Sequence, residues 1–345
     1  MTSEPPALTL AETPALLIVL MGSLGDIVRA LPLASVVKHH RPGARLSWVA
    51  DWRWRELVEA HPGIDRVVVF PRERTPSAIA AFVRELRRER ADITLDLQRL
   101  LKSGLCSRVS GAARRIGFDP ANAKEFNHLF NTEYIGARPP RLPKWRHYLA
   151  FAGSLGLPPP DHLDFGLGRL ADRRLLPAAV GPIAGRFVAL VMGSSWPSKD
   201  WNLEGYLGLA SLISRETTYR MVLLGDSSRQ DLAARIAAGV RGPEVVNLAG
   251  RTSLTELGAT LGAARAAIGP DTGPSHLAAA LGTPYVTLFG PTEPERVAPY
   301  GCEHLAVRSP VDCEPCRRRR CRRREGRCLD AITPAMAWRA LEPLL

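Results

Sequence analysis

A glycine-containing loop near the N-terminus carries a carboxylate directly after an apolar run. The apolar residues 16–21 precede Gly22, Ser23, Leu24, Gly25 and Asp26, and an amphipathic pattern continues from there to residue 40. A turn between a strand and the N-terminus of a helix gathers backbone N–H groups and suits an anion. Asp26 can serve there as a general base, or it can be a first-turn acid that the helix dipole favours. Spacing alone leaves both roles open.

A second loop of the same kind lies in the other half of the chain. The apolar run 266–268 leads into Asp271, Thr272, Gly273, Pro274, Ser275 and His276. Proline suits a first helical turn, so the N–H groups near Thr272, Gly273 and Ser275 are expected to point at a phosphate. The pattern predicts a pyrophosphate site, and a well-capped helix with a buried histidine is the alternative.

A third loop follows the apolar run 187–192 and contains Ser194, Ser195 and Lys199. Two hydroxyls and an ammonium on one loop can orient a phosphate and neutralise its charge. A solvated surface lysine is the alternative for Lys199. Its place beside the predicted phosphate site favours the binding role.

The elements that must position these loops follow a βα rhythm. Short apolar runs alternate with helical patterns, which is typical of a parallel sheet; they cover residues 16–21, 46–50, 67–70, 93–97, 187–192, 221–224, 245–248, 266–268 and 285–289. The rhythm stops over residues 155–186, where proline, glycine, aspartate and arginine dominate, so we place a domain linker there. We expect Rossmann-like domains over 1–165 and 180–330. A helix with Thr333 as its N-cap should end the chain within 331–345.

Size and charge bound the classes of function. The 345 residues, 46% of them hydrophobic and 23% charged, suffice for two domains. No apolar run approaches the roughly 20 residues of a membrane span. The first 14 residues carry acids and prolines where a secretory signal would be basic and then apolar, so we expect a cytoplasmic protein.

Half of the net charge of +12 lies in one segment, because residues 313–328 hold eight arginines against two glutamates, giving +6. A basic segment implies an anionic partner, and a solvated tail is the alternative. Aromatic residues for base stacking are missing from the arginine run, which argues against nucleic acid.

Four of the six cysteines lie in the same segment. Cys313, Cys316, Cys321 and Cys328 follow the spacing C-x2-C-x4-C-x6-C. In a reducing compartment disulfides are unusual, so the pattern leaves two interpretations. The four side chains either remain thiols or bind a structural zinc ion, although the spacing differs from the paired C-x2-C units of zinc ribbons.

Three motifs resemble the heptosyltransferases of glycosyltransferase family 9, which transfer heptose from ADP-heptose to lipopolysaccharide. Ser23 to Asp26 is similar to the S-x-G-D segment of that family, Asp271 to His276 to its D-T-G-x-x-H loop, and Phe289 to Thr292 continues the pattern. The likeness covers nearly the whole chain. It implies an α/β protein of GT-B architecture, with two Rossmann-like doubly wound parallel sheets facing a cleft. The first domain would bind mostly the acceptor, and the second the nucleotide donor.

The resemblance also assigns roles to single residues. It makes Asp26 the general base of an inverting transfer and Lys102, in a D-x-Q-x-x-x-K-S segment, an acceptor-binding residue. The donor-binding residues that it implies are Ser194, Ser195, Lys199, Asp226, Thr252, Asp271, Thr272, Gly273 and His276. Lys199 and the backbone amides would replace a metal ion, so we expect neither a catalytic metal nor a cofactor. The implied partners are an ADP-sugar and an anionic glycolipid, with peripheral contact to the inner membrane surface.

A nicotinamide-dependent oxidoreductase is the rival interpretation. It would use the first Rossmann unit, with Asp51 after the second strand holding a ribose hydroxyl. The dinucleotide fingerprint G-x-G-x-x-G needs a second glycine two residues after Gly22. This chain has Leu24 at that position. The missing glycine argues against this rival.

Overall fold

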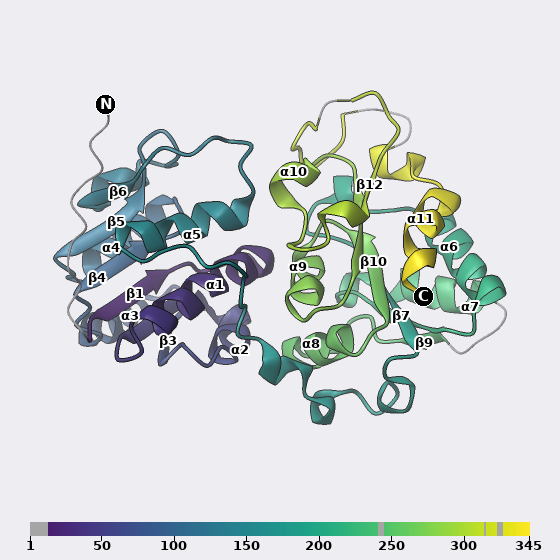
Figure 1. The fold of residues 1–345 in the computed structure, drawn as a ribbon, viewed down its shortest axis with the longest axis horizontal. Coiled ribbons are helices and arrows are strands. Elements are labelled where there is room, and N and C mark those ends of the chain that lie inside the picture. Colours follow the sequence, from purple (N-terminus) through teal and green to yellow (C-terminus); the bar gives the residue numbers. More distant parts are fainter. Residues whose placement is uncertain (1–12, 241–244, 314, 323–326) are drawn as a thin grey trace. The chain divides into compact units, whose positions relative to one another are not determined.

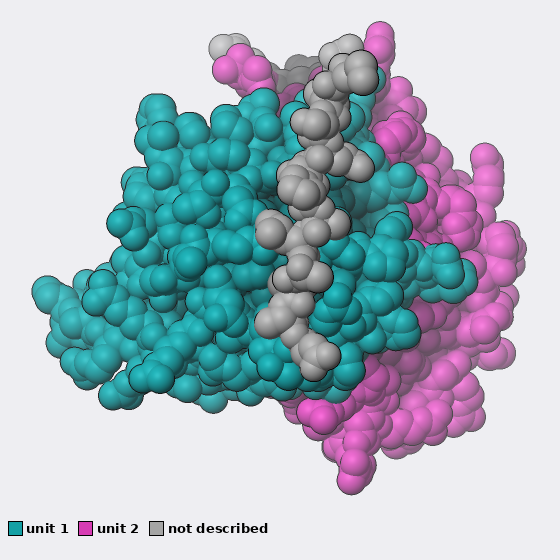
Figure 2. Space-filling view, turned by 60° about the vertical axis from the view of Figure 1, so that its left-hand side comes forward, with its two compact units in different colours: residues 1–166 teal, residues 167–345 magenta. Residues whose placement is uncertain are grey.

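The protein divides into two compact units, residues 1–166 and 167–345 (Figure 2). The computed structural model describes residues 13–240, 245–313, 315–322 and 327–345. Most of the N-terminal segment that lacks signal-peptide character, and the middle of the arginine run at 323–326, lie outside the described residues. Each unit is built around its own parallel sheet.

The first unit holds a six-stranded parallel sheet in the order β3-β2-β1-β4-β5-β6 (Figure 1). Its strands are β1 (Ala15–Val19), β2 (Arg45–Asp51), β3 (Arg66–Phe70), β4 (Ile93–Asp96), β5 (Arg114–Phe118) and β6 (Glu133–Ile135). The accompanying helices are α1 (Leu24–His40), α2 (Arg55–Glu59), α3 (Pro76–Arg88), α4 (Leu101–Val109) and α5 (Lys144–Ser154). Strands β1 and β4 are buried almost throughout because helices cover both faces of a parallel sheet.

The second unit repeats this architecture with the order β12-β11-β10-β7-β8-β9. Its strands are β7 (Phe187–Val191), β8 (Arg220–Leu224), β9 (Val245–Asn247), β10 (Ala266–Pro270), β11 (Tyr285–Phe289) and β12 (Ala306–Arg308). Its helices are α6 (Leu203–Glu216), α7 (Gln230–Gly239), α8 (Leu254–Gly262), α9 (Gly273–Ala280), α10 (Pro294–Val297) and α11 (Pro334–Leu341).

The strand order fixes where ligands are expected in each unit. The order reverses between β1 and β4, which pair directly, and again between β7 and β10. Open α/β sheets bind ligands outside the carboxyl ends of their strands at such a switch point. Asp26 lies in the first turn of the helix that follows the β1 loop, and the segments after β7 and β10 carry Lys199 and Asp271. All three predicted loops therefore lie at switch points.

The structure confirms the predicted βα rhythm and adds three strands. Each of the nine apolar runs forms a strand, within two residues at either end. The sequence analysis missed β5, β6 and β12. Two of these have only three residues, and β5 begins with Arg114 and Arg115, so none of them presents a long apolar run.

The connecting segment after Gly166 packs into the second unit. It contains three 3-10 helices, and Leu170 of the first is buried against Gly258 of α8. Helix α11 begins as predicted, since the Thr333 side chain accepts from the N–H of Met336 and a proline occupies the first turn. None of the helices in the described ranges combines the length and the apolar character that crossing a bilayer requires.

Candidate active site

Asp26 lies in the first turn of α1, where it meets four donors. Ser23 precedes the helix, and its Oγ donates to Asp26 Oδ2 at 3.0 Å. Three other donors converge on Oδ1 at 3.0 Å each, namely Lys144 Nζ, Arg29 Nη1 and the Tyr148 hydroxyl. The carboxylate keeps 20% of its side-chain surface exposed. Asp26 is thus the predicted first-turn acid, and it also remains open to a small ligand group.

The surroundings of Asp26 keep it ionised. Burial alone would raise the pKa of this carboxyl, but the charges of Lys144 and Arg29, with the hydrogen bonds from Lys144 and Ser23, outweigh burial and hold the pKa far below its usual range. Burial and the neighbouring Asp26 charge raise the pKa of Tyr148, which stays a neutral donor. An ionised carboxylate can accept a proton, but two attached cations make it a weak base.

The first residues of the predicted acceptor segment, residues 96–103, hold the loop before Asp26. Gln98 Oε1 accepts from the backbone N–H of Met21 at 2.7 Å, two residues after the end of β1. Asp96 is fully buried, receives Nδ2 of Asn127 at 2.7 Å, and accepts from the N–H of Gln98. Burial raises the pKa of Asp96 despite these bonds. Asp96 can support the loop because it is buried at the end of β4. Sequence reasoning missed this role.

Lys102 is half-buried at the carboxyl end of the first sheet. Its Nζ lies 4.2 Å from the ring centroid of Phe70, the last residue of β3. Burial lowers the pKa of Lys102, and the charge of Asp51, the last residue of β2, acts in the opposite direction. An ammonium at this edge is suitably placed for an anionic ligand. The acceptor-binding role of Lys102 stays a prediction.

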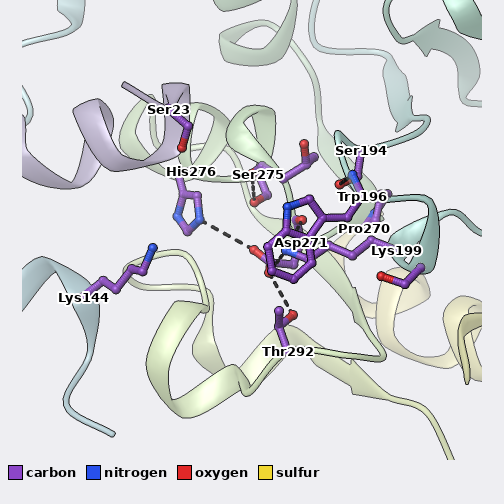
Figure 3. A network of polar contacts seen from close by, with 12 residues as sticks. Ser23, Lys144, Ser194, Trp196, Lys199, Pro270, Asp271, Ser275, His276 and Thr292 are labelled. Carbon is purple, nitrogen blue, oxygen red and sulfur yellow. Dashed lines mark hydrogen bonds and ion pairs between the residues drawn. The ribbon is translucent and has the colours of Figure 1, made fainter. Parts of the chain in front are cut away.

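In the second unit Lys199 and Asp271 form a buried ion pair, which Figure 3 shows from close by. Lys199 Nζ lies 2.6 Å from Asp271 Oδ2, and their side chains are 13% and 5% exposed. The Thr292 hydroxyl donates to the same oxygen at 2.8 Å, and His276 Nε2 lies 3.9 Å from the other oxygen. The pair joins the loop after β7 to the loop after β10. Lys199 is therefore not the solvated surface lysine of the alternative interpretation.

The D-T-G-x-x-H loop leads directly into α9. Thr272 is the N-cap and Gly273 the first helical residue. The expectation for Ser275 is wrong, because both its N–H and its hydroxyl donate to the carbonyl of Thr272 within the turn. His276 is buried, as the alternative predicts. The amides of Thr272 and Gly273 remain the predicted phosphate donors.

Four further donor-binding candidates lie on post-strand loops of the same unit. Ser194 Oγ accepts from the N–H of Trp196 at 3.1 Å, and Ser195 is exposed. Asp226 caps a 3-10 helix by accepting from the N–H of Ser228, and Thr252 is half-buried two residues before α8. Capping gives Asp226 a structural use, and contact of these residues with a nucleotide stays a prediction.

The arginine segment packs on the loop after β7. Ser198 donates its N–H to the carbonyl of Arg319 at 3.2 Å and its hydroxyl to that of Arg318 at 2.6 Å. Arg319 Nη2 donates to the carbonyl of Ser195, and Arg327 Nη1 to that of Pro197. These contacts anchor the segment to the second unit, while the arginine side chains at 317–320 stay exposed, so the choice between an anionic partner and a solvated segment stays open. Because about 120 positions separate the partners, the sequence pattern carried no signal for this contact.

The four clustered cysteines line one cavity of about 170 Å³, together with Gly290 and Thr292. None of the six cysteines is in a disulfide. Burial is the main cause that raises the pKa of the Cys328 thiol. The charges of the neighbouring Cys321 and Cys316 act in the same direction. Among the residues that the structure describes, no three His, Cys, Asp or Glu side chains are placed to hold one metal ion. A structural zinc ion therefore stays a prediction from the spacing.

Comparisons with known proteins agree with this arrangement. The model of glycosyltransferase family 9 (heptosyltransferase) matches residues 79–325. Lipopolysaccharide heptosyltransferase 1 of Pseudomonas aeruginosa is 29% identical over 319 residues, covering 88% of this chain and 86% of its own. The enzyme of that name from Escherichia coli K12 is 26% identical over 306 residues, covering 85% of this chain and 93% of its own.

Solved structures share the fold. E. coli heptosyltransferase WaaC with ADP has a TM-score of 0.79 at 24% identity, covering 96% of this chain and 99% of its own. The same enzyme with ADP-2-deoxy-2-fluoro heptose has a TM-score of 0.76 with the same identity and coverage. These likenesses and the two six-stranded parallel sheets confirm the predicted GT-B fold class. The comparisons give no support to the nicotinamide oxidoreductase. The chain belongs to glycosyltransferase family 9, the heptosyltransferase family.

Proposed function

We propose that this protein transfers a heptose, or a closely related sugar, from an ADP-sugar to the lipopolysaccharide inner core or a similar glycan, with inversion at the anomeric carbon. The relatives named lipopolysaccharide heptosyltransferase 1 support this acceptor, and the solved complexes with ADP and a fluorinated ADP-heptose support this donor. The observation that carries the catalytic part is the ionised Asp26 at the switch point of the first sheet.

In the proposed reaction the acceptor hydroxyl gives its proton to Asp26 and its oxygen attacks the anomeric carbon. The bond from that carbon to the pyrophosphate oxygen breaks on the opposite face, and ADP leaves, which inverts the configuration. Negative charge develops on the departing pyrophosphate. Lys199 and the amides of Thr272 and Gly273 stabilise it, and fixed donors of this kind act most strongly where water is excluded. No divalent metal takes part in the proposed steps.

The acceptor proposed here is anionic, and the exposed arginines 317–320 suit it. Guanidinium groups bind phosphates and carboxylates in a bidentate manner. A cluster of them near an acidic bilayer gains about 1 kcal/mol per residue. We therefore place the protein in the cytoplasm, in peripheral contact with the inner face of the cytoplasmic membrane.

The purified full chain tests the proposal in three assays. ADP should raise the melting temperature while NAD does not, because only a bound ligand stabilises the native state. ADP-heptose should be consumed with a lipopolysaccharide core acceptor, and NMR of the product should show an inverted anomer. Asp26→Asn should lower turnover by about 10²-fold or more with ADP affinity unchanged. Near-normal turnover in that variant would remove Asp26 from catalysis, and a retained anomer would refute inversion.

A further inference from the structure

The partners of Asp26 differ in how firmly the fold holds them. Arg29 lies one helical turn away on α1, and its side chain is only 10% exposed. Tyr148 is buried on α5. Lys144 is the first residue of α5, directly after Pro143, and its side chain is 23% exposed. Of the two cations, Lys144 is thus the more exposed, and it lies at a helix end.

The side chain of Lys144 is also chemically suited to change partners. Its ammonium is a point charge on a flexible four-carbon stem, whereas a guanidinium in a fixed geometry is harder to redirect. An anionic ligand that reaches this edge of the first unit offers the ammonium an alternative to Asp26. When Lys144 moves to such a ligand, the carboxylate keeps Arg29 as its paired cation and the Ser23 and Tyr148 hydroxyls as donors.

We propose that Lys144 is a specificity-determining residue that links the charge of the acceptor to the strength of the base. An anionic group of the acceptor binds the Lys144 ammonium and draws it from Asp26, and the carboxylate then accepts the hydroxyl proton more readily. An acceptor without that group leaves Lys144 on Asp26 and reacts slowly. The inference rests on the proposed function of Asp26 as general base.

Electrostatics gives the direction of the effect. A nearby opposite charge favours the charged form of a carboxylate, so the loss of one cation raises its pKa and its basicity. The charged groups that face Asp26 are Arg29 from α1 and Lys144 from α5, and Arg99 acts on the adjacent Tyr148. Arg29 remains in place in both states. The change in base strength therefore depends on Lys144.

A purely structural role is the competing explanation, because the Lys144–Asp26 pair also joins α5 to α1. A structural pair would affect all acceptors alike. A residue that senses charge would affect anionic and neutral acceptors differently, so the test compares one acceptor with and without its anionic groups.

The experiment measures kcat/KM against pH for the wild type and Lys144→Met, which keeps the chain length and removes the charge. The acceptors are a core glycan with its phosphate and carboxylate groups and the same glycan dephosphorylated and esterified. The wild type should prefer the anionic glycan by about 10-fold or more, the range of one charge-assisted hydrogen bond. In Lys144→Met this preference should shrink to about twofold, and the acid limb of the pH profile should move to higher pH with both acceptors.

Two variants serve as controls in the same assay. Lys144→Arg keeps the charge on a guanidinium that is harder to redirect, so it should keep only part of the preference and leave the acid limb in place. Arg146→Met removes an exposed charge two residues along α5, and it should keep both the preference and the acid limb, which separates a specific contact from general attraction.

An equal loss with both acceptors and an unmoved acid limb in Lys144→Met would overturn the inference and leave a structural ion pair. A loss of preference in Arg146→Met as large as in Lys144→Met would also overturn it. Asp26→Asn is measured in parallel. If that variant is nearly inactive while Lys144→Met changes nothing, only this inference fails, whereas near-normal turnover in Asp26→Asn refutes the base itself.

Discussion

Asp271→Asn tests the buried ion pair between Lys199 and Asp271 most directly. Asparagine keeps the shape of the side chain and an oxygen for the Thr292 hydroxyl, but it removes the charge that lies 2.6 Å from Lys199 Nζ. Removing one partner of a buried pair costs about 3–5 kcal/mol because the other charge stays buried. For a unit of 179 residues (167–345), 1 kcal/mol corresponds to about 2–4 °C. The melting temperature of this unit should therefore fall by about 6–20 °C.

The assay is thermal unfolding of the full chain by circular dichroism, with and without saturating ADP. The pyrophosphate should supply the missing negative charge beside Lys199, so ADP should raise the melting temperature more in Asp271→Asn than in the wild type. The double variant Lys199→Met with Asp271→Asn should recover part of the lost stability, since removing both charges leaves none buried. Asp172→Asn is the matched control, because its partner Arg174 is 89% exposed, and it should change the melting temperature by about 2 °C or less.

Three results would refute this reasoning. A melting temperature of Asp271→Asn within about 2 °C of the wild type would show that the pair adds nothing to stability. An equal rise with ADP in both proteins would show that Lys199 does not meet the phosphates. A double variant less stable than Asp271→Asn would show that the ammonium itself is needed for folding.

Four other predictions follow from the second unit. Lys199→Ala should raise the KM for the ADP-sugar more than Ser195→Ala does, because an ammonium neutralises charge while an exposed hydroxyl only orients it; the reverse order would contradict the phosphate role of Lys199. Added Mg²⁺ or Mn²⁺ should leave turnover unchanged, and strict dependence on either ion would disprove the metal-free reaction. Replacing Arg318 and Arg320 by serine should reduce binding to anionic vesicles and raise the acceptor KM with ADP binding unchanged, and binding should also fall as salt rises; unaltered vesicle binding and acceptor use would contradict the membrane role. Elemental analysis should find about one zinc per chain, lost in Cys321→Ser, if the spacing encodes a zinc site; a ratio near zero would contradict it.

The sequence was sufficient for the fold because apolar runs and glycine loops are local signals. The apolar runs before Gly22 and Gly193 form the central strands β1 and β7. Asp26 and Lys199 follow these strands as predicted. The edge strands β6 and β12 have only three residues each, too few for a period of two to stand out.

The sequence could not predict which side chains contact each other within each site, because the partners are far apart along the chain. Lys144 and Tyr148 have the spacing of one helical face, which is a visible pattern. Their contact with Asp26, 118 and 122 residues earlier, depends on how α5 packs on α1. The contact between Arg319 and the loop at Ser195 spans 124 residues. Such contacts arise from tertiary packing, which propensities and motifs do not describe.

The packing of α11 has a consequence for synthesis of the chain on the ribosome. Helix α11 contacts α6, and Trp201 Nε1 donates to the carbonyl of Ile332 at 2.9 Å in the interior of the second unit. The first unit contains all of its strands by residue 135 and can fold while translation continues. The second unit keeps an apolar helix face and a buried indole N–H without their partners until its last residues emerge. Folding of the second unit should therefore finish only after α11 has emerged, and a nascent chain stopped before Ile332 should expose α6 and bind chaperones.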